Sequence, residues 1–192
     1  MKNITTIIFL MWSVFAQAQA AYTWPEYSPT VNYNFKKEFP ALPEPTQVLN
    51  DCSGVIGTTS YRWWCFRWGS NRNSTISDLA ITNMLKYMNT EFAYFRDVMG
   101  WPPDIRAQKG YRSTIYLYGS GLCTDDAPNT EGGGWQGNIY YNGRNWPMIL
   151  ASYIPVRSFD PAYADAFQTG AMVHEGIHAI LADMPGVKQA AW

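Results

Sequence analysis

Two histidines and a glutamate lie within five residues near the end of the sequence, at His174, Glu175 and His178. In an α-helix, residues four apart lie roughly 40° around the axis and about 6 Å along it, so both imidazoles can reach one ion. Glu175 falls between them in angle and points near that ion without having to bind it. The pattern predicts a catalytic zinc site, in which His174 and His178 bind Zn²⁺ and Glu175 is the general base for a metal-activated water.

The motif stands out against the rest of the chain. These are the only 2 histidines among 192 residues, and a His-Glu-x-x-His run rarely arises by chance. The neighbouring residues Ala171, Ile177 and Ile180 are apolar, so unpartnered imidazoles and a carboxylate would be costly among them. A helix that carries two histidines without a metal is the alternative, and we favour the metal site.

A long helix must pack beside the motif. Ser74 or Thr75 can cap it, and apolar residues then recur every three or four positions up to Met99, as expected for a helix with one face on a sheet. They are Ile81, Leu85, Met88, Phe92, Phe95 and Met99. Gly100 is placed as the residue after the last turn, and Pro102-Pro103 prevent continuation.

The motif itself falls on a second predicted helix. Asp160 is a suitable N-cap followed by Pro161 at the first helical position, so this helix is expected from about Ala162 to Asp183. Four strands are expected from alternation and β-rich composition, at residues 61–68, 113–118, 138–141 and 147–154. Asn142-Gly143 is a hairpin turn signal. The fold class is therefore α+β, with a twisted mixed sheet of about four strands.

The beginning of the chain has the features of an export signal. Lys2 precedes the apolar run Ile7–Phe15, and Ala18-Gln19-Ala20 matches the small-x-small pattern of a cleavage site. We expect residues 1–20 to be a signal peptide, 21–48 an extended lead-in rich in proline and aromatic residues, and 49–192 one domain. The protein is then secreted or periplasmic, with no membrane span in the mature chain.

Export makes a disulfide plausible, and the sequence has 3 cysteines. Cys52 and Cys65 are expected to pair, because Gly54 and Gly57 between them allow the chain to fold back. Cys123 would then be free or would pair with a cysteine after Trp192. The near-neutral balance of 14 basic and 15 acidic residues argues against a nucleic-acid partner.

Around its histidine motif the chain resembles the zincin metallopeptidases, and the gluzincin branch in particular. More narrowly, it resembles a poorly characterised family of secreted proteins regarded as zinc peptidases. The features that carry the resemblance are His174–His178, Phe66–Gly69, Val98–Pro103 and Gly119–Leu122. The resemblance implies the upper subdomain of a zincin, zinc on His174 and His178, Glu175 as the residue that activates water, and a peptide or protein substrate. It also implies that the strand at 147–154 is the edge along which an extended substrate lies.

The chain departs from that family in its third zinc ligand. The metzincin branch would have glycine at 181 and histidine at 184, where this sequence has Leu181 and Met184. Asp183 would lie on the opposite face of the helix. The gluzincin branch takes a glutamate from a later helix, so we expect the third ligand and the C-terminal subdomain beyond Trp192, and residues 1–192 alone to be inactive.

A function without catalysis is the competing hypothesis. Five tryptophans together with many tyrosines could form a sugar-stacking surface on a secreted glycan- or protein-binding module; they are Trp63, Trp64, Trp68, Trp135 and Trp146. Packing in the core and against the sheet is the more common use of such residues, and it is the one we favour for them.

Overall fold

The computed structural model describes residues 41–125, 133–163 and 168–182, and it is an α+β fold built on one mixed five-stranded sheet. The expected signal peptide and most of the expected lead-in lie outside these residues. The strands are β1 (Gly57–Tyr61), β2 (Trp64–Trp68), β3 (Ser113–Leu117), β4 (Gly134–Tyr141) and β5 (Arg144–Ala151). The expected fold class is confirmed, with five strands where about four were expected.

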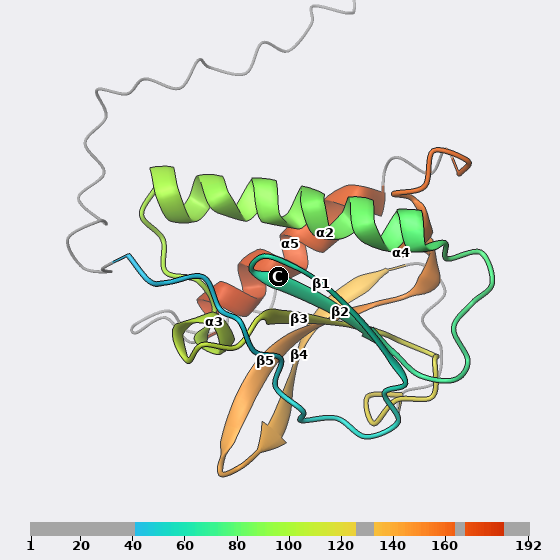
Figure 1. Cartoon of the computed structure of the whole chain (residues 1–192), viewed down its shortest axis with the longest axis horizontal. Coiled ribbons are helices and arrows are strands. Elements are labelled where there is room, and N and C mark those ends of the chain that lie inside the picture. Colours follow the sequence, from blue (N-terminus) through green and yellow to red (C-terminus); the bar gives the residue numbers. More distant parts are fainter. Residues whose placement is uncertain (1–40, 126–132, 164–167, 183–192) are drawn as a thin grey trace, which may run out of the picture. The chain divides into compact units, whose positions relative to one another are not determined.

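The sheet has the strand order β1-β2-β3-β5-β4 (Figure 1). The strands β2, β3 and β5 are parallel, and the antiparallel strands β1 and β4 form the two edges. The prediction that residues 147–154 form an edge strand is therefore wrong. Residues 146–151 of β5 are buried because the strand pairs on both sides, whereas β4 is partly exposed along its length.

Two strand predictions needed revision at their ends. The expected strand 61–68 is divided by a turn at Arg62 and Trp63, with Arg62 at φ +48°, so its first residue ends β1 and the rest forms β2. The expected strand 147–154 ends at Ala151. The hairpin between β4 and β5 turns at Asn142-Gly143, where both residues have positive φ, as the sequence predicted.

The long helix α2 (Asp78–Ala93) continues as a π-helical turn, η2 (Tyr94–Val98), and Gly100 follows with φ +72°. The N-cap is Ser77 rather than the expected Ser74 or Thr75. The Ser77 hydroxyl accepts from the Ala80 N–H and donates to Asp160 at 2.5 Å. Donation from Ser77 lowers the pKa of the Asp160 carboxyl. The same hydrogen bond ties the start of α2 to a loop 83 residues later in the chain.

The last predicted helix is shorter than expected. Residues Tyr153–Arg157 form a separate helix, α4, and the motif helix α5 runs from Thr169 to Leu181. Asp160 caps a turn instead of a long helix, because its carboxylate accepts from the Ala162 N–H and from Ser77. A short helix, α3 (Ile105–Gln108), precedes β3.

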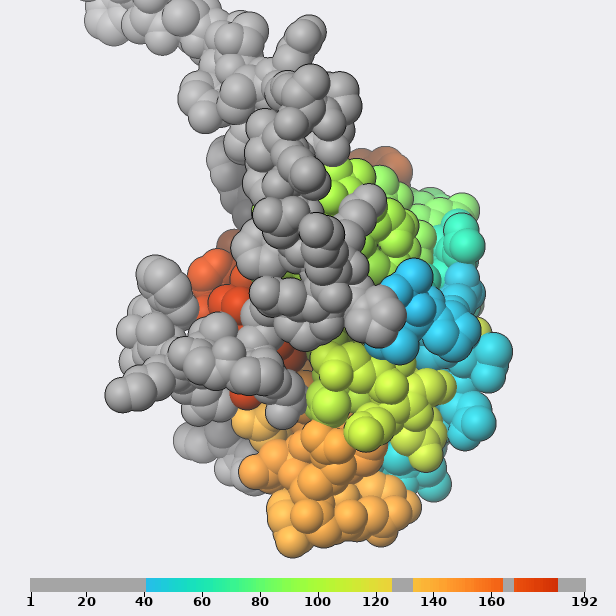
Figure 2. Space-filling model, turned by 90° about the vertical axis from the view of Figure 1, so that its left-hand side faces the viewer, coloured from blue at the N-terminus to red at the C-terminus, as the bar shows by residue number. Residues whose placement is uncertain are grey.

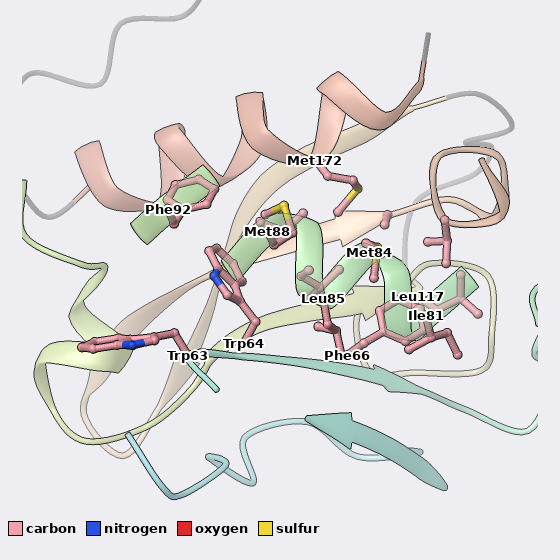
Figure 3. Packing of buried hydrophobic residues seen from close by; sticks show 14 of the residues in the cluster. Trp63, Trp64, Phe66, Ile81, Met84, Leu85, Met88, Phe92, Leu117 and Met172 are labelled. Atoms are coloured by element: carbon pink, nitrogen blue, oxygen red, sulfur yellow. The ribbon is translucent and has the colours of Figure 1, made fainter. Parts of the chain in front are cut away.

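The main core lies between the sheet and the helices α2 and α5, which cover one face (Figure 1). Met172 of α5 points toward Met84 and Met88 of α2, and Phe66 and Leu117 rise from the sheet below (Figure 3). All five side chains are fully buried. The predicted apolar stripe is confirmed as the buried face of α2 from Ile81 to Phe92, whereas Phe95 and Met99, beyond α2, are only partly buried.

The segment that begins at Ala41 passes over the face of the sheet opposite α2 and α5, where Asp51 forms buried ionic and hydrogen-bonding contacts. The Asp51 carboxylate accepts from Arg106 at 2.6 Å and from the Tyr116 hydroxyl at 2.5 Å, and Arg67 donates to that hydroxyl and to the Leu49 carbonyl. Burial and the neighbouring Asp51 raise the pKa of Tyr116. In Figure 2 the first described residues, in blue, lie beside the yellow-green segment that precedes β3, and Gln47 bridges to Tyr111 there.

One disulfide joins Cys52 to Cys123, so the predicted pairing of Cys52 with Cys65 is wrong. Cys65 is fully buried in β2, where its sulfur contacts Thr114 Oγ1 at 3.4 Å. The loop after β3 instead returns to the Cys52 segment, with the Cys123 N–H donating to the Ser53 carbonyl. Cys65 is nearer to Cys52 in the sequence, which favoured that pairing. In the folded chain the loop after β3 places Cys123 beside Cys52, although the two are 71 residues apart.

We predict that replacing Cys52 and Cys123 together with alanine lowers the free energy of unfolding by about 4 kcal/mol, because the bridge closes a loop of 71 residues. Denaturant unfolding measures this loss. Cys65→Ala, the control, leaves the bridge in place and should cost much less.

Burial raises the pKa of the Cys65 thiol to about 11, so a thiol reagent at pH 8 should label no cysteine until the protein unfolds. Labelling of Cys52 or Cys123 in the folded, non-reduced protein would contradict the assignment.

Candidate zinc-binding site

One face of the helix α5 is buried in the core, and the histidine motif lies next to that face. Met172, Gly176, Ala179 and Ile180 are its buried residues, at intervals of three and four. They pack toward α2 and the sheet, which leaves the three predicted site residues on the flank of the helix. The apolar stripe fixes the helix on the core, and His174, Glu175 and His178 occupy positions outside that stripe.

The two histidines come together as their spacing predicted. His174 Nε2 and His178 Nε2 lie 3.0 Å apart, and the ring centroids are 4.6 Å apart. Zinc–nitrogen bonds of ~2.0–2.1 Å place two ligand nitrogens about 3.3 Å apart in a tetrahedral site, so the observed separation fits two ligands of one ion. A single proton shared between the rings is the other arrangement that this distance allows.

Glu175 lies beside the pair, close to β4. Its Oε1 is 4.0 Å from His174 Nε2, and its side chain is only 12% exposed, whereas that of His174 is 61% exposed. At this distance the carboxylate makes no hydrogen bond with the His174 ring, yet it would lie near an ion bound by the two histidines. The structure thus places the three predicted residues together, with the glutamate on the sheltered side.

The strand β4 approaches Glu175 at Gly134. A Cβ built on Gly134 would lie 3.4 Å from Glu175 Cγ, in van der Waals contact, and 3.3 Å from the Leu150 carbonyl oxygen, which is a tight approach. The sequence predicted a strand only over residues 138–141, whereas β4 already begins at Gly134. The glycine at this position was the one signal in the sequence for such a close approach.

Close packing also explains the glycine inside the motif. A Cβ on Gly176 would lie 2.4 Å from Phe92 Cζ and 3.3 Å from Met88 Cε, so the two helices could not keep their separation. Glycine weakens a helix by about 1 kcal/mol relative to alanine. Here that cost allows the aromatic ring of α2 to lie against the backbone of α5.

A third zinc ligand is not found among the residues that the structure describes. No group of three or more His, Cys, Asp or Glu side chains is arranged there to hold a metal. Among the described residues, the donor chemistry of His174 and His178 fits two of the four positions of a tetrahedral zinc ion. Asp183 and Met184 lie outside the described residues.

The tryptophans considered for a sugar-stacking surface are mostly in the interior. Trp63, Trp64 and Trp146 are buried. The Arg96 guanidinium stacks over the Trp63 ring, 4.1 Å from its centre, and the ring centroids of Trp64 and Phe92 are 4.9 Å apart. These three residues stabilise the core and its rim.

Comparison with known proteins finds no matching family model, no matching curated protein and no matching solved structure. In the part of the chain described, no helix has the length and hydropathy needed to cross a membrane.

We predict that Gly176→Ala destabilises the fold by about 1–3 kcal/mol, because the added methyl group meets the rigid ring of Phe92. Gly170→Ala in the same helix is the matched control. None of the described residues lies within 4 Å of a Cβ at Gly170, so that change should stabilise the helix by up to about 1 kcal/mol. Thermal unfolding of both variants tests this, and Phe92→Leu should relieve part of the Gly176→Ala loss. Equal effects of the two substitutions would contradict the packing argument.

Proposed function

We propose that the protein is a secreted zinc-dependent hydrolase, a metallopeptidase in which His174 and His178 bind Zn²⁺ and Glu175 is the general base. The 3.0 Å separation of the two Nε2 atoms carries the proposal. It is supported by the exposure of His174 and by the partial burial of Glu175 next to it. The disulfide is consistent with an extracellular or periplasmic location.

Zinc at such a site polarises a substrate carbonyl and makes water a better nucleophile at neutral pH. Glu175 then accepts the proton of the attacking water and can return it to the leaving amine. Its sheltered position limits solvation of the carboxylate, and its Oε1 atom lies 4.0 Å from His174 Nε2, near the position that an ion on the histidines would take. The imidazoles of His174 and His178 would hold the ion as uncharged ligands, which would leave its positive charge available to polarise the carbonyl.

The neighbouring strand supports a peptide as the substrate. Within the described residues β4 pairs only with β5, so one side of its backbone is available to an extended chain. Gly134 brings that strand against Glu175. A peptide added at this edge would run past the carboxylate, a role that the sequence had assigned to residues 147–154.

We predict that the purified protein binds zinc through His174 and His178, and weakly, because two protein ligands leave two positions to water. Isothermal titration with Zn²⁺ after metal removal measures this affinity. His174→Ala and His178→Ala should each abolish binding, whereas Glu175→Gln should preserve it. A protein that binds no zinc would favour the alternative of a binding module without catalysis.

We predict no peptide hydrolysis by residues 1–192 alone and hydrolysis by a chain that also supplies a third ligand. In that active chain Glu175→Gln should reduce kcat by at least about 100-fold while zinc stays bound, because an amide cannot accept the proton of water. Cleavage of an unlabelled protein followed by mass spectrometry provides the assay. Full activity of Glu175→Gln, or robust hydrolysis by residues 1–192, would count against this mechanism.

A further inference from the structure

A second site lies away from the histidines, where three parallel strands end. A cavity of about 280 Å³ is formed by residues that follow β2, β3 and β5. Its volume is close to the lower end of the ~300–1,000 Å³ typical of small-ligand sites. Among the described residues, those that line it are uncharged, so this part of the wall suits a neutral ligand better than an ionic one.

A buried hydroxyl without a partner lies in this wall. Ser152 is 1% exposed, and its Oγ makes no hydrogen bond with the described residues. Ser120 nearby shows the usual alternative: it is equally buried, but its Oγ donates to the Leu117 carbonyl and accepts from the Gly69 N–H. Because an unpaired buried hydroxyl is costly, Ser152 points to a polar occupant of the cavity.

Two asparagine side chains add hydrogen-bond donors to the cavity. Asn73 Oδ1 accepts both the N–H of Thr75 at 2.9 Å and its hydroxyl at 2.7 Å, which fixes the amide and leaves Nδ2 to donate elsewhere. Asn71 Oδ1 accepts from the Ser70 hydroxyl at 3.4 Å, which leaves its NH₂ group in the same situation. Amide donors held in this way match neutral oxygen acceptors such as sugar hydroxyls.

Two tyrosines also line the cavity, Tyr118 and Tyr153. Tyr118 is braced by Trp135, with ring centroids 5.0 Å apart, and Tyr153 precedes the core residues of α4. Aromatic rings beside neutral hydrogen-bonding groups suit a ligand with one apolar face and several hydroxyls. We propose that this cavity binds a single neutral hexopyranose unit, independently of the zinc site.

The proposal is tested with the purified full chain and a panel of methyl glycosides of glucose, galactose and mannose, followed by NMR titration. At least one glycoside should bind saturably. Ser152→Ala should weaken its binding about tenfold, the loss expected for one hydrogen bond to the ligand. The same variant should fold at least as stably as the parent, since it removes an unpaired hydroxyl from the interior.

Ser158→Ala is the matched control, because the Ser158 hydroxyl donates to the Ile154 carbonyl within α4 and does not line the cavity. It should leave glycoside binding unchanged. Asn71→Ala, at an exposed position, provides a second test should Ser152→Ala fail to fold. A panel without any binding would mean that the cavity holds only water, and binding unaffected by Ser152→Ala and Asn71→Ala would place the sugar elsewhere; either result overturns the proposal.

Discussion

The contact between α5 and α2 is the constraint on which the candidate site depends. Gly176 lies against Phe92, and Met172 is buried among the methionines of α2, so the helix has one rotation about its axis that buries its apolar stripe. That rotation decides which side chains face outward. With the stripe buried, both histidine rings project from the flank and Glu175 turns toward β4. The chemistry of the site is therefore fixed by apolar packing on the other side of the same helix.

The opposite face of the sheet is organised by charge. Asp51 is enclosed with Arg106 and Arg67, and all three are largely or wholly inaccessible to water. Removing one partner from such a cluster typically costs 3–5 kcal/mol, because the remaining charge is left buried and uncompensated. The cluster ties the segment around Asp51 to α3 and to two strands. The adjacent disulfide adds the loop after β3, and this loop supports the cavity that contains Ser152.

The two candidate sites differ in how far they could be predicted. The spacing of His174 and His178 is local, since helical geometry places the two side chains on the same face and their rotamers then bring the Nε2 atoms within 3.0 Å. The contact between Glu175 and Gly134 joins distant parts of the chain, because the pairing of β4 with β5 positions Gly134 next to α5. The cavity at the ends of β2, β3 and β5 had no signal in the sequence, since its residues come from three separate segments.

Local sequence patterns were enough to predict the α+β class, the apolar stripe of α2, the hairpin turn at Asn142-Gly143 and the histidine motif. Each depends on residues within a few positions of one another, where periodicity and turn chemistry act directly. Tertiary structure decided which strand is the edge, where the motif helix begins and which cysteine bonds to Cys52. These depend on contacts between segments tens of residues apart. Their free energy comes from burying whole faces and closing long loops, and no short pattern in the sequence encodes it.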